Sequence, residues 1–197
     1  MKPPAAGVIR GLEGGAAKRI ETPRLCLLPL AEGDFAPWLA CVSDPETARL
    51  MGGDFPRNAA EGRALFEKEL ESGRFYAIHP VEGGEYMGHV CVSAPYPPVE
   101  ALTSITGKQG ASLSYVVAPS YRRRGVASEA VKAMIDWLFR EKRLDYVNCG
   151  YYEYNAASAA LQKRLGFLPL STHYFLMDGK RVQVVENILY RRNLNPL

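Results

Sequence analysis

The chain has 197 residues, of which 47% are hydrophobic and 23% are charged, as is usual for a soluble globular protein of one domain. Its 24 basic and 21 acidic residues nearly balance, which argues against a disordered chain and against nucleic-acid binding. The richest apolar stretch, Leu25–Leu30, falls far short of the roughly 20 residues that cross a bilayer, so we expect no membrane partner.

Residues 1–19 are rich in Gly, Ala and Pro and show no periodicity. We therefore expect a flexible N-terminal tail over 1–19, followed by a single domain over 20–197. The tail contains no apolar segment of the kind found in secretory signals. We expect a cytoplasmic protein whose four scattered cysteines are reduced and mostly buried, without a metal site.

Apolar periodicity and capping residues predict a mixed order of strands and helices. In chain order, the predicted elements are a strand over Arg24–Leu30, helices starting at Asp34, Asp44 and Asn58, strands over Phe75–His79, Tyr86–Ser93 and Ser112–Val117, a helix over Ala127–Lys142, a strand over Asp145–Gly150, a helix over Asn155–Leu165 and a hairpin turning at Asp178-Gly179. A strand–helix–strand–helix segment inside an otherwise antiparallel order predicts an α/β or α+β fold with a parallel crossover. The segment Ala94–Gly110 is expected to be a long loop.

The segment Leu113–Ala130 is a predicted strand, then a basic turn, then a helix start. Free N–H groups and the positive end of the dipole at a helix N-terminus bind phosphate. Gly125 lets the backbone approach a ligand closely, and Ser128 offers a hydroxyl. The run Arg122–Arg124 raises the local positive potential. These features together predict a phosphate-binding loop.

The pattern Arg122-x-x-Gly125-x-Ala127 resembles the motif with which GNAT N-acetyltransferases hold the pyrophosphate of acetyl-CoA. Further matches lie at Pro119, Glu129-Ala130, Asn155-x-x-Ser158, Leu165-Gly166-Phe167, Glu21-Thr22-Pro23-Arg24-Leu25 and Ser43-Asp44-Pro45-Glu46. The last two resemble the start of the branch that contains the ribosomal-protein N-terminal acetyltransferases of RimJ/RimL type. The likeness extends over about Ile20 to Tyr190.

This resemblance implies a mixed, mostly antiparallel sheet of about seven strands, flanked by helices and splayed between strands 4 and 5, where acetyl-CoA enters. It also implies which residues bind this co-substrate. The backbone of Val116 and Val117 would pair with the pantetheine arm, and Asn155 and Ser158 would lie near the thioester. The residues that would hold the pyrophosphate are Arg122, Arg123, Arg124, Gly125, Val126, Ala127 and Ser128.

The implied reaction is direct attack by a primary amine on the acetyl carbonyl, without metal or covalent enzyme intermediate. Many family members place a tyrosine shortly before the Gly-Phe pair as an acid toward the departing CoA thiolate, but this chain has Gln162 there. Either Ser158 hydrogen-bonds the thiolate, or no protein acid is needed because a thiol of pKa about 8.5 leaves readily. Asn155 could equally serve only as a helix cap, and Ser158 only as a small packing residue. No general base is identified.

The acceptor amine stays open between a protein N-terminus and a small molecule, because fold and donor site do not determine it. Ala94–Gly110 and Asp54–Asn58 are expected to border the acceptor pocket. The alternative function is a non-catalytic module that binds or senses acyl-CoA, which Gln162 and the unidentified base keep open. A homodimer is compatible with the resemblance, whereas His79 and His89 are expected to be ordinary, partly buried imidazoles.

Overall fold

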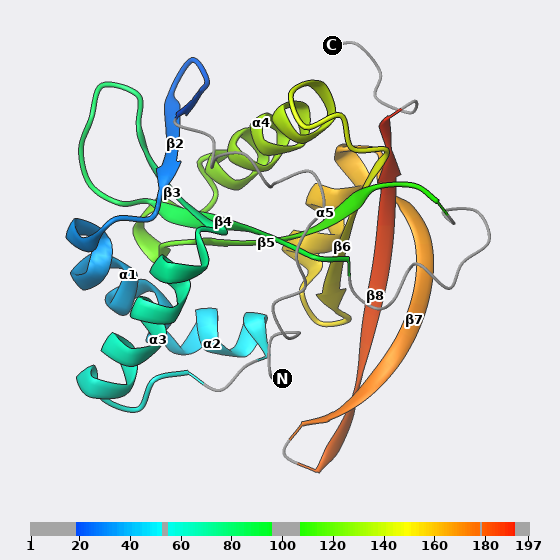
Figure 1. Cartoon of the computed structure of the whole chain (residues 1–197). Coiled ribbons are helices and arrows are strands. Elements are labelled where there is room, and N and C mark those ends of the chain that lie inside the picture. Colours follow the sequence, from blue (N-terminus) through cyan, green and yellow to red (C-terminus); the bar gives the residue numbers. More distant parts are fainter. Residues whose placement is uncertain (1–18, 53–54, 96–106, 178, 192–197) are drawn as a thin grey trace. The chain divides into compact units, whose positions relative to one another are not determined.

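The computed structural model describes residues 19–52, 55–95, 107–177 and 179–191 (Figure 1). The tail predicted over 1–19 lies outside the described residues except for Arg19, as does most of the loop predicted over Ala94–Gly110. Contacts between Cα atoms divide the described chain into two compact units. Unit 1 consists of residues 19–52, 55–92 and 115–134, and unit 2 consists of residues 93–95, 107–114, 135–177 and 179–191.

Hydrogen bonding joins eight strands in the order β1-β2-β3-β4-β5-β6-β8-β7. The β5–β6 pair is parallel, and the pairs β1–β2, β2–β3, β3–β4, β6–β8 and β7–β8 are antiparallel. The predicted mixed, mostly antiparallel α/β architecture is therefore confirmed. The sheet has one strand more than the seven expected, namely β1 (Ile20–Glu21). It is only two residues long and is defined by its pairing with β2.

The remaining strands are β2 (Leu25–Pro29), β3 (Phe75–Pro80), β4 (Gly88–Ser93), β5 (Gly110–Val117), β6 (Tyr146–Tyr152), β7 (Leu168–Met177) and β8 (Lys180–Tyr190). The helices are α1 (Phe35–Val42), α2 (Pro45–Met51), α3 (Ala59–Ser72), α4 (Val126–Arg140) and α5 (Ala156–Arg164). Both β5 and α4 contribute residues to each unit. Figure 1 shows β7 and β8 as a long hairpin, drawn in orange and red.

In unit 1, side-chain caps begin two helices at the predicted residues. The N–H of Thr47 donates to Asp44 Oδ2 at 2.8 Å, and the N–H of Glu61 donates to Asn58 Oδ1 at 2.9 Å. These bonds satisfy donors that a helix leaves without an internal acceptor. The N-termini of α2 and α3 are therefore set by local sequence.

Asp34 behaves differently from the predicted cap of α1. A 3₁₀ turn over Glu32–Asp34 precedes this helix, and the Asp34 side chain makes no cap bond to it. Its carboxylate instead accepts from the N–H of Ala31 at 2.9 Å and lies 3.3 Å from His79 Nε2. Asp34 thus closes the turn before α1 and pairs with a histidine of β3.

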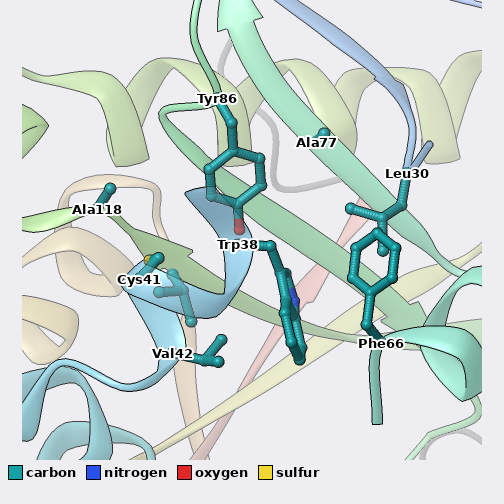
Figure 2. Close-up of a cluster of buried hydrophobic side chains, with 9 residues drawn as sticks. Leu30, Trp38, Cys41, Val42, Phe66, Ala77, Tyr86 and Ala118 are labelled. Carbon is teal, nitrogen blue, oxygen red and sulfur yellow. The ribbon is translucent and has the colours of Figure 1, made fainter. Parts of the chain in front are cut away.

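The hydrophobic core of unit 1 holds the C-terminal end of β5 in position. Figure 2 shows the indole of Trp38 at the centre of this core, and its ring meets Phe66 edge to face at 5.1 Å between centroids. The cluster comprises Leu30, Trp38, Cys41, Val42, Phe66, Ala77, Tyr86, Val116 and Ala118. Val116 and Ala118 belong to this cluster, so close packing fixes the backbone where the chain leaves β5.

In unit 2, parallel pairing between β5 and β6 covers Gly110–Ser112 and Tyr146–Asn148. The rest of β5, Leu113–Val117, extends past this pairing. The strands predicted as the fourth and the fifth are β5 and β6, because β1 adds one to the numbering. The short pairing therefore agrees with the splay predicted between them. Gly110 is required here, because a Cβ at this residue would collide with the buried ring of Tyr146.

Candidate functional site

In unit 1 a basic loop, Ala118–Gly125, connects β5 to α4. The N–H of Ala118 donates to Met87 O at 2.9 Å, and a 3₁₀ turn follows over Pro119–Tyr121. Two residues then adopt the left-handed region, Arg123 with φ 61° and Gly125 with φ 81°. This conformation is strained for a non-glycine residue such as Arg123, and such strain occurs often at functional sites.

Helix α4 begins directly after the basic loop. Its first residues are Val126, Ala127 and Ser128, and the N–H of Glu129 already donates to Gly125 O at 3.0 Å. N–H groups in the first turn of an α-helix lack an acceptor within the helix. Together with the positive end of the dipole, they form a site suited to an anion.

Arg122 is tied to the protein rather than extended into solvent. Its Nε donates to Val117 O at 3.2 Å, and its Nη2 donates to Asp44 Oδ2 at 2.9 Å and to Thr47 Oγ1 at 2.5 Å. The N–H of Thr47, its hydroxyl and Arg122 together lower the pKa of Asp44. The side chain predicted to touch pyrophosphate therefore connects the basic loop to the N-terminus of α2.

Arg24 contacts the basic loop from the start of β2, a role that the sequence analysis did not predict for it. Its Nη1 donates to Arg124 O at 3.2 Å, and its Nε donates to Glu129 Oε2 at 2.7 Å. Burial alone would raise the pKa of Glu129, but hydrogen bonds from Thr22 and Arg24 prevail and lower it. The matched motif around Arg24 was the signal that could have revealed this contact.

In unit 2, the half-buried Asn155 and the buried Ser158 belong to a chain of hydrogen-bonded polar residues. Asn155 Oδ1 caps α5 by accepting from the N–H of Ser158 at 3.1 Å. Gln162 donates through Nε2 to Ser158 Oγ at 3.1 Å, and accepts through Oε1 from Asn187 Nδ2 at 2.8 Å. Gln162 is completely buried, and its amide also lies 3.2 Å from Cys149 Sγ.

The capping interpretation of Asn155 is thus confirmed, while its contact with a ligand stays a prediction. Gln162, which replaces the tyrosine expected from the resemblance, donates to the oxygen of Ser158. The Ser158 hydroxyl accepts from Gln162, and a hydroxyl is a donor as well as an acceptor. The arrangement can supply a hydrogen-bond donor, but not an ionisable acid.

Glu186 of β8 is a buried carboxyl that the sequence did not single out. It is 5% exposed, and Gly150 on β6 leaves the space that its carboxyl occupies. Burial raises the pKa of Glu186 to about 7, although a hydrogen bond with Asn148 acts in the opposite direction. Within the described residues Oε2 has no hydrogen-bond partner, and His173 Nε2 lies 3.9 Å from Oε1. The apolar residues on either side of it in β8, Val184, Val185, Ile188 and Leu189, were the available signal in the sequence.

The histidines of unit 1 occupy different environments. His89 is buried, its Nδ1 lies 2.6 Å from the Tyr86 hydroxyl, and burial lowers its pKa to about 4. The hydrogen bond with Asp34 raises the pKa of His79. The neutral, enclosed His89 fits the interpretation of an ordinary buried imidazole.

The four cysteines are all buried and free, as predicted. Across residues 19–52, 55–95, 107–177 and 179–191, no three His, Cys, Asp or Glu side chains are grouped to share a metal ion. In the same ranges, each helix is too short or too polar to span a bilayer.

Comparison with known proteins agrees with this architecture. A family model described as an acetyltransferase (GNAT) domain matches residues 24–168. Among curated proteins, none matches the chain significantly.

Solved structures share the fold. An acetyltransferase of the GNAT family from Bacillus anthracis is 15% identical, with a TM-score of 0.75 over 88% of this chain and 99% of that one. A spermidine N-acetyltransferase from Vibrio cholerae, in complex with CoA and spermine, is 15% identical, with a TM-score of 0.71 over 87% of this chain and 98% of that one. A ribosomal-protein alanine acetyltransferase from Vibrio fischeri is 16% identical, with a TM-score of 0.66 over 90% and 99%. Because the family model spans well over half of the sequence, the chain belongs to the GNAT acetyltransferase family.

Proposed function

We propose that the protein is an acetyl-CoA-dependent N-acetyltransferase that moves the acetyl group directly to a primary amine. The observation that carries this proposal is the basic loop, which contains two left-handed residues and leads directly into the N-terminus of α4. Membership of the GNAT family supports the same donor. The related spermidine acetyltransferase, whose structure holds CoA, adds support.

The pyrophosphate would be bound by the backbone N–H groups from Arg123 to Ser128 and by the side chains of Arg123 and Arg124. Arg122 would contribute mainly by holding the loop, because its guanidinium already donates to Val117, Asp44 and Thr47. Val116 and Val117 lie past the β5–β6 pairing, and their backbone would pair with the pantetheine arm.

The transfer step needs few groups from the protein. The amine nitrogen attacks the carbonyl carbon, the carbon–sulfur bond breaks, and the amine loses a proton to water. Ser158, held by Gln162 at 3.1 Å and near the thioester in this proposal, would donate its hydroxyl hydrogen to the departing thiolate. Neither Ser158 nor Gln162 is an acid at neutral pH, so the thiolate would leave by hydrogen bonding alone.

The acceptor is proposed to be a protein N-terminus or a small amine. Solved structures with this fold include one named for spermidine and one named for a ribosomal-protein alanine, so both classes of amine belong in the screen. Gln162 favours a second candidate function, in which the chain binds acyl-CoA without turnover. We also propose that the protein acts in the cytoplasm; a homodimer is compatible with the family resemblance.

Calorimetric titration of acetyl-CoA tests the donor site. Wild type should bind, and Gly125→Asp should not, because the new side chain strains a left-handed residue and adds a negative charge. Circular dichroism would show that this variant still folds. Release of CoA with spermidine or with N-terminal peptides then identifies the acceptor class. Absence of binding to wild type would overturn the proposal, and binding without release over a broad amine panel would favour the second candidate.

A further inference from the structure

A carboxylate occupies the first turn of α4, beside the proposed pyrophosphate site. The pKa of Glu129 is lowered, so this side chain is ionised at neutral pH. Like charges repel, and a carboxylate next to a polyanion opposes its binding. Electrostatics alone would therefore make Glu129 weaken anion binding at this site, so its role has to be sought in its contacts.

Thr22 and Arg24, in the segment before β2, bind the Glu129 carboxylate. Thr22 Oγ1 donates to its Oε1 at 2.6 Å, and the N–H of Arg24 donates to the same oxygen at 3.1 Å. The Arg24 guanidinium approaches Oε2 through Nε at 2.7 Å and through Nη2 at 2.5 Å. Both nitrogens converge on this one carboxylate oxygen, in a charge-assisted contact that is stronger than a neutral hydrogen bond.

The same guanidinium reaches the basic loop itself. Arg24 Nη1 donates to Arg124 O at 3.2 Å, directly before Gly125. A Cβ at residue 125 would lie 3.2 Å from Arg24 Nη2, so glycine leaves space for this contact. The backbone of Arg24 is itself fixed, because its carbonyl accepts from the N–H of Val81 at 2.9 Å. One arginine thus joins the loop, the first turn of α4 and the sheet.

We propose that Glu129 and Arg24 are positioning residues that hold the basic loop in its anion-binding conformation. Arg24 contacts the chain at Arg124 and at Glu129, one on each side of Gly125. Both contacts come shortly after Arg123 in the sequence, whose left-handed backbone is strained and needs support from its surroundings. This inference rests on the proposed function, because its effect is measured on acetyl-CoA binding.

Glu129→Gln separates positioning from direct electrostatics by the sign of its effect. Removing a negative charge beside a polyanion should strengthen binding if only charge mattered. If Glu129 positions the loop, losing the charged contact with Arg24 should weaken acetyl-CoA binding by about tenfold. Arg24→Lys keeps the positive charge but cannot reach both Glu129 Oε2 and Arg124 O as the guanidinium does, and should weaken binding to a similar extent.

The two substitutions should not add, because each breaks the same contact. We expect the double variant to bind acetyl-CoA about as weakly as either single variant. Amide hydrogen exchange over 122–129, measured without acetyl-CoA, should accelerate in both single variants. Glu67→Gln, which removes a carboxylate paired with Arg63 on α3, is the matched control and should change neither measurement.

Calorimetry with acetyl-CoA, accompanied by thermal unfolding, gives distinguishable outcomes. Failure of wild type to bind overturns the proposed function, and this inference with it. If wild type binds while Glu129→Gln binds equally or more tightly and keeps wild-type exchange, the positioning role is overturned. Should Glu129→Gln fold poorly, Thr22→Val removes one hydrogen bond to the same carboxylate and should give a smaller change in the same direction.

Discussion

Replacing Glu186 with glutamine should stabilise the protein, by an amount that increases with pH. Burial raises the pKa of Glu186 to about 7, so the folded protein binds its proton more tightly than the unfolded chain does. The contribution of Glu186 to the unfolding free energy of the wild type is therefore full below the pKa that Glu186 has in the unfolded chain. It is lost as pH rises through the pKa that Glu186 has in the folded protein. The glutamine side chain of the Glu186→Gln variant carries no charge, so the variant does not show this loss.

The magnitude follows from the two pKa values. The shift from 4.5 to about 7 corresponds to about 3 kcal/mol of unfolding free energy once the carboxyl is fully ionised. The substitution also adds an amide whose hydrogen bonds change stability by a constant amount. Only the part that varies with pH therefore measures the buried charge.

Urea unfolding followed by circular dichroism, at pH 5 and pH 8.5, provides the measurement. The advantage of Glu186→Gln over wild type should grow by about 2–3 kcal/mol between these two values. His89, whose pKa burial lowers to about 4, has the opposite pH dependence, but it is present in both proteins and cancels from the difference. An equal difference at both pH values would refute the conclusion that Glu186 is a buried, proton-binding carboxyl.

Other substitutions test separate parts of the structure. Gly110→Ala should lower the unfolding free energy by about 1–3 kcal/mol in urea titrations, because its Cβ collides with the buried Tyr146 ring. Asp44→Ala should lower it by about 1 kcal/mol through loss of the α2 cap, and Asp44→Asn, which can still cap, should lower it less. Gln162→Leu should reduce kcat severalfold with little effect on the KM for acetyl-CoA, because Ser158 loses the donor that orients it. An equal effect of Ser158→Ala would show that both act in the same step.

Local sequence was sufficient for the elements whose ends depend on nearby residues. The caps Asp44, Asn58 and Asn155 each bond to an N–H three residues later, so their helices were predictable. Asp34 has the same residue type as Asp44, but a preceding 3₁₀ turn takes its carboxylate. The existence of β1 depends on pairing with another strand, which a two-residue segment does not signal.

The parts of the site that sequence could not provide depend on contacts between distant segments. Arg24 and Glu129 are 105 residues apart, and no periodicity indicates that their side chains form an ion pair. Glu186 is buried because Gly150 on another strand leaves room for it. Arg122 was recognised by its motif, but its bond with Asp44 was not, since each residue had a sufficient local explanation.

The hydrogen-bonded chain Asn187–Gln162–Ser158 has a consequence for the rate profile. Amides and hydroxyls do not titrate between about pH 6 and pH 9, so this chain adds no ionisation of its own there. An acetyl transfer served by it would follow the fraction of acceptor amine that is deprotonated. The inflection in a plot of log kcat/KM against pH would then report the acceptor: near pH 8 for a protein α-amine, and near pH 10 for an alkyl amine such as lysine. The pH dependence of the rate would thus identify the class of substrate as well as the behaviour of the enzyme.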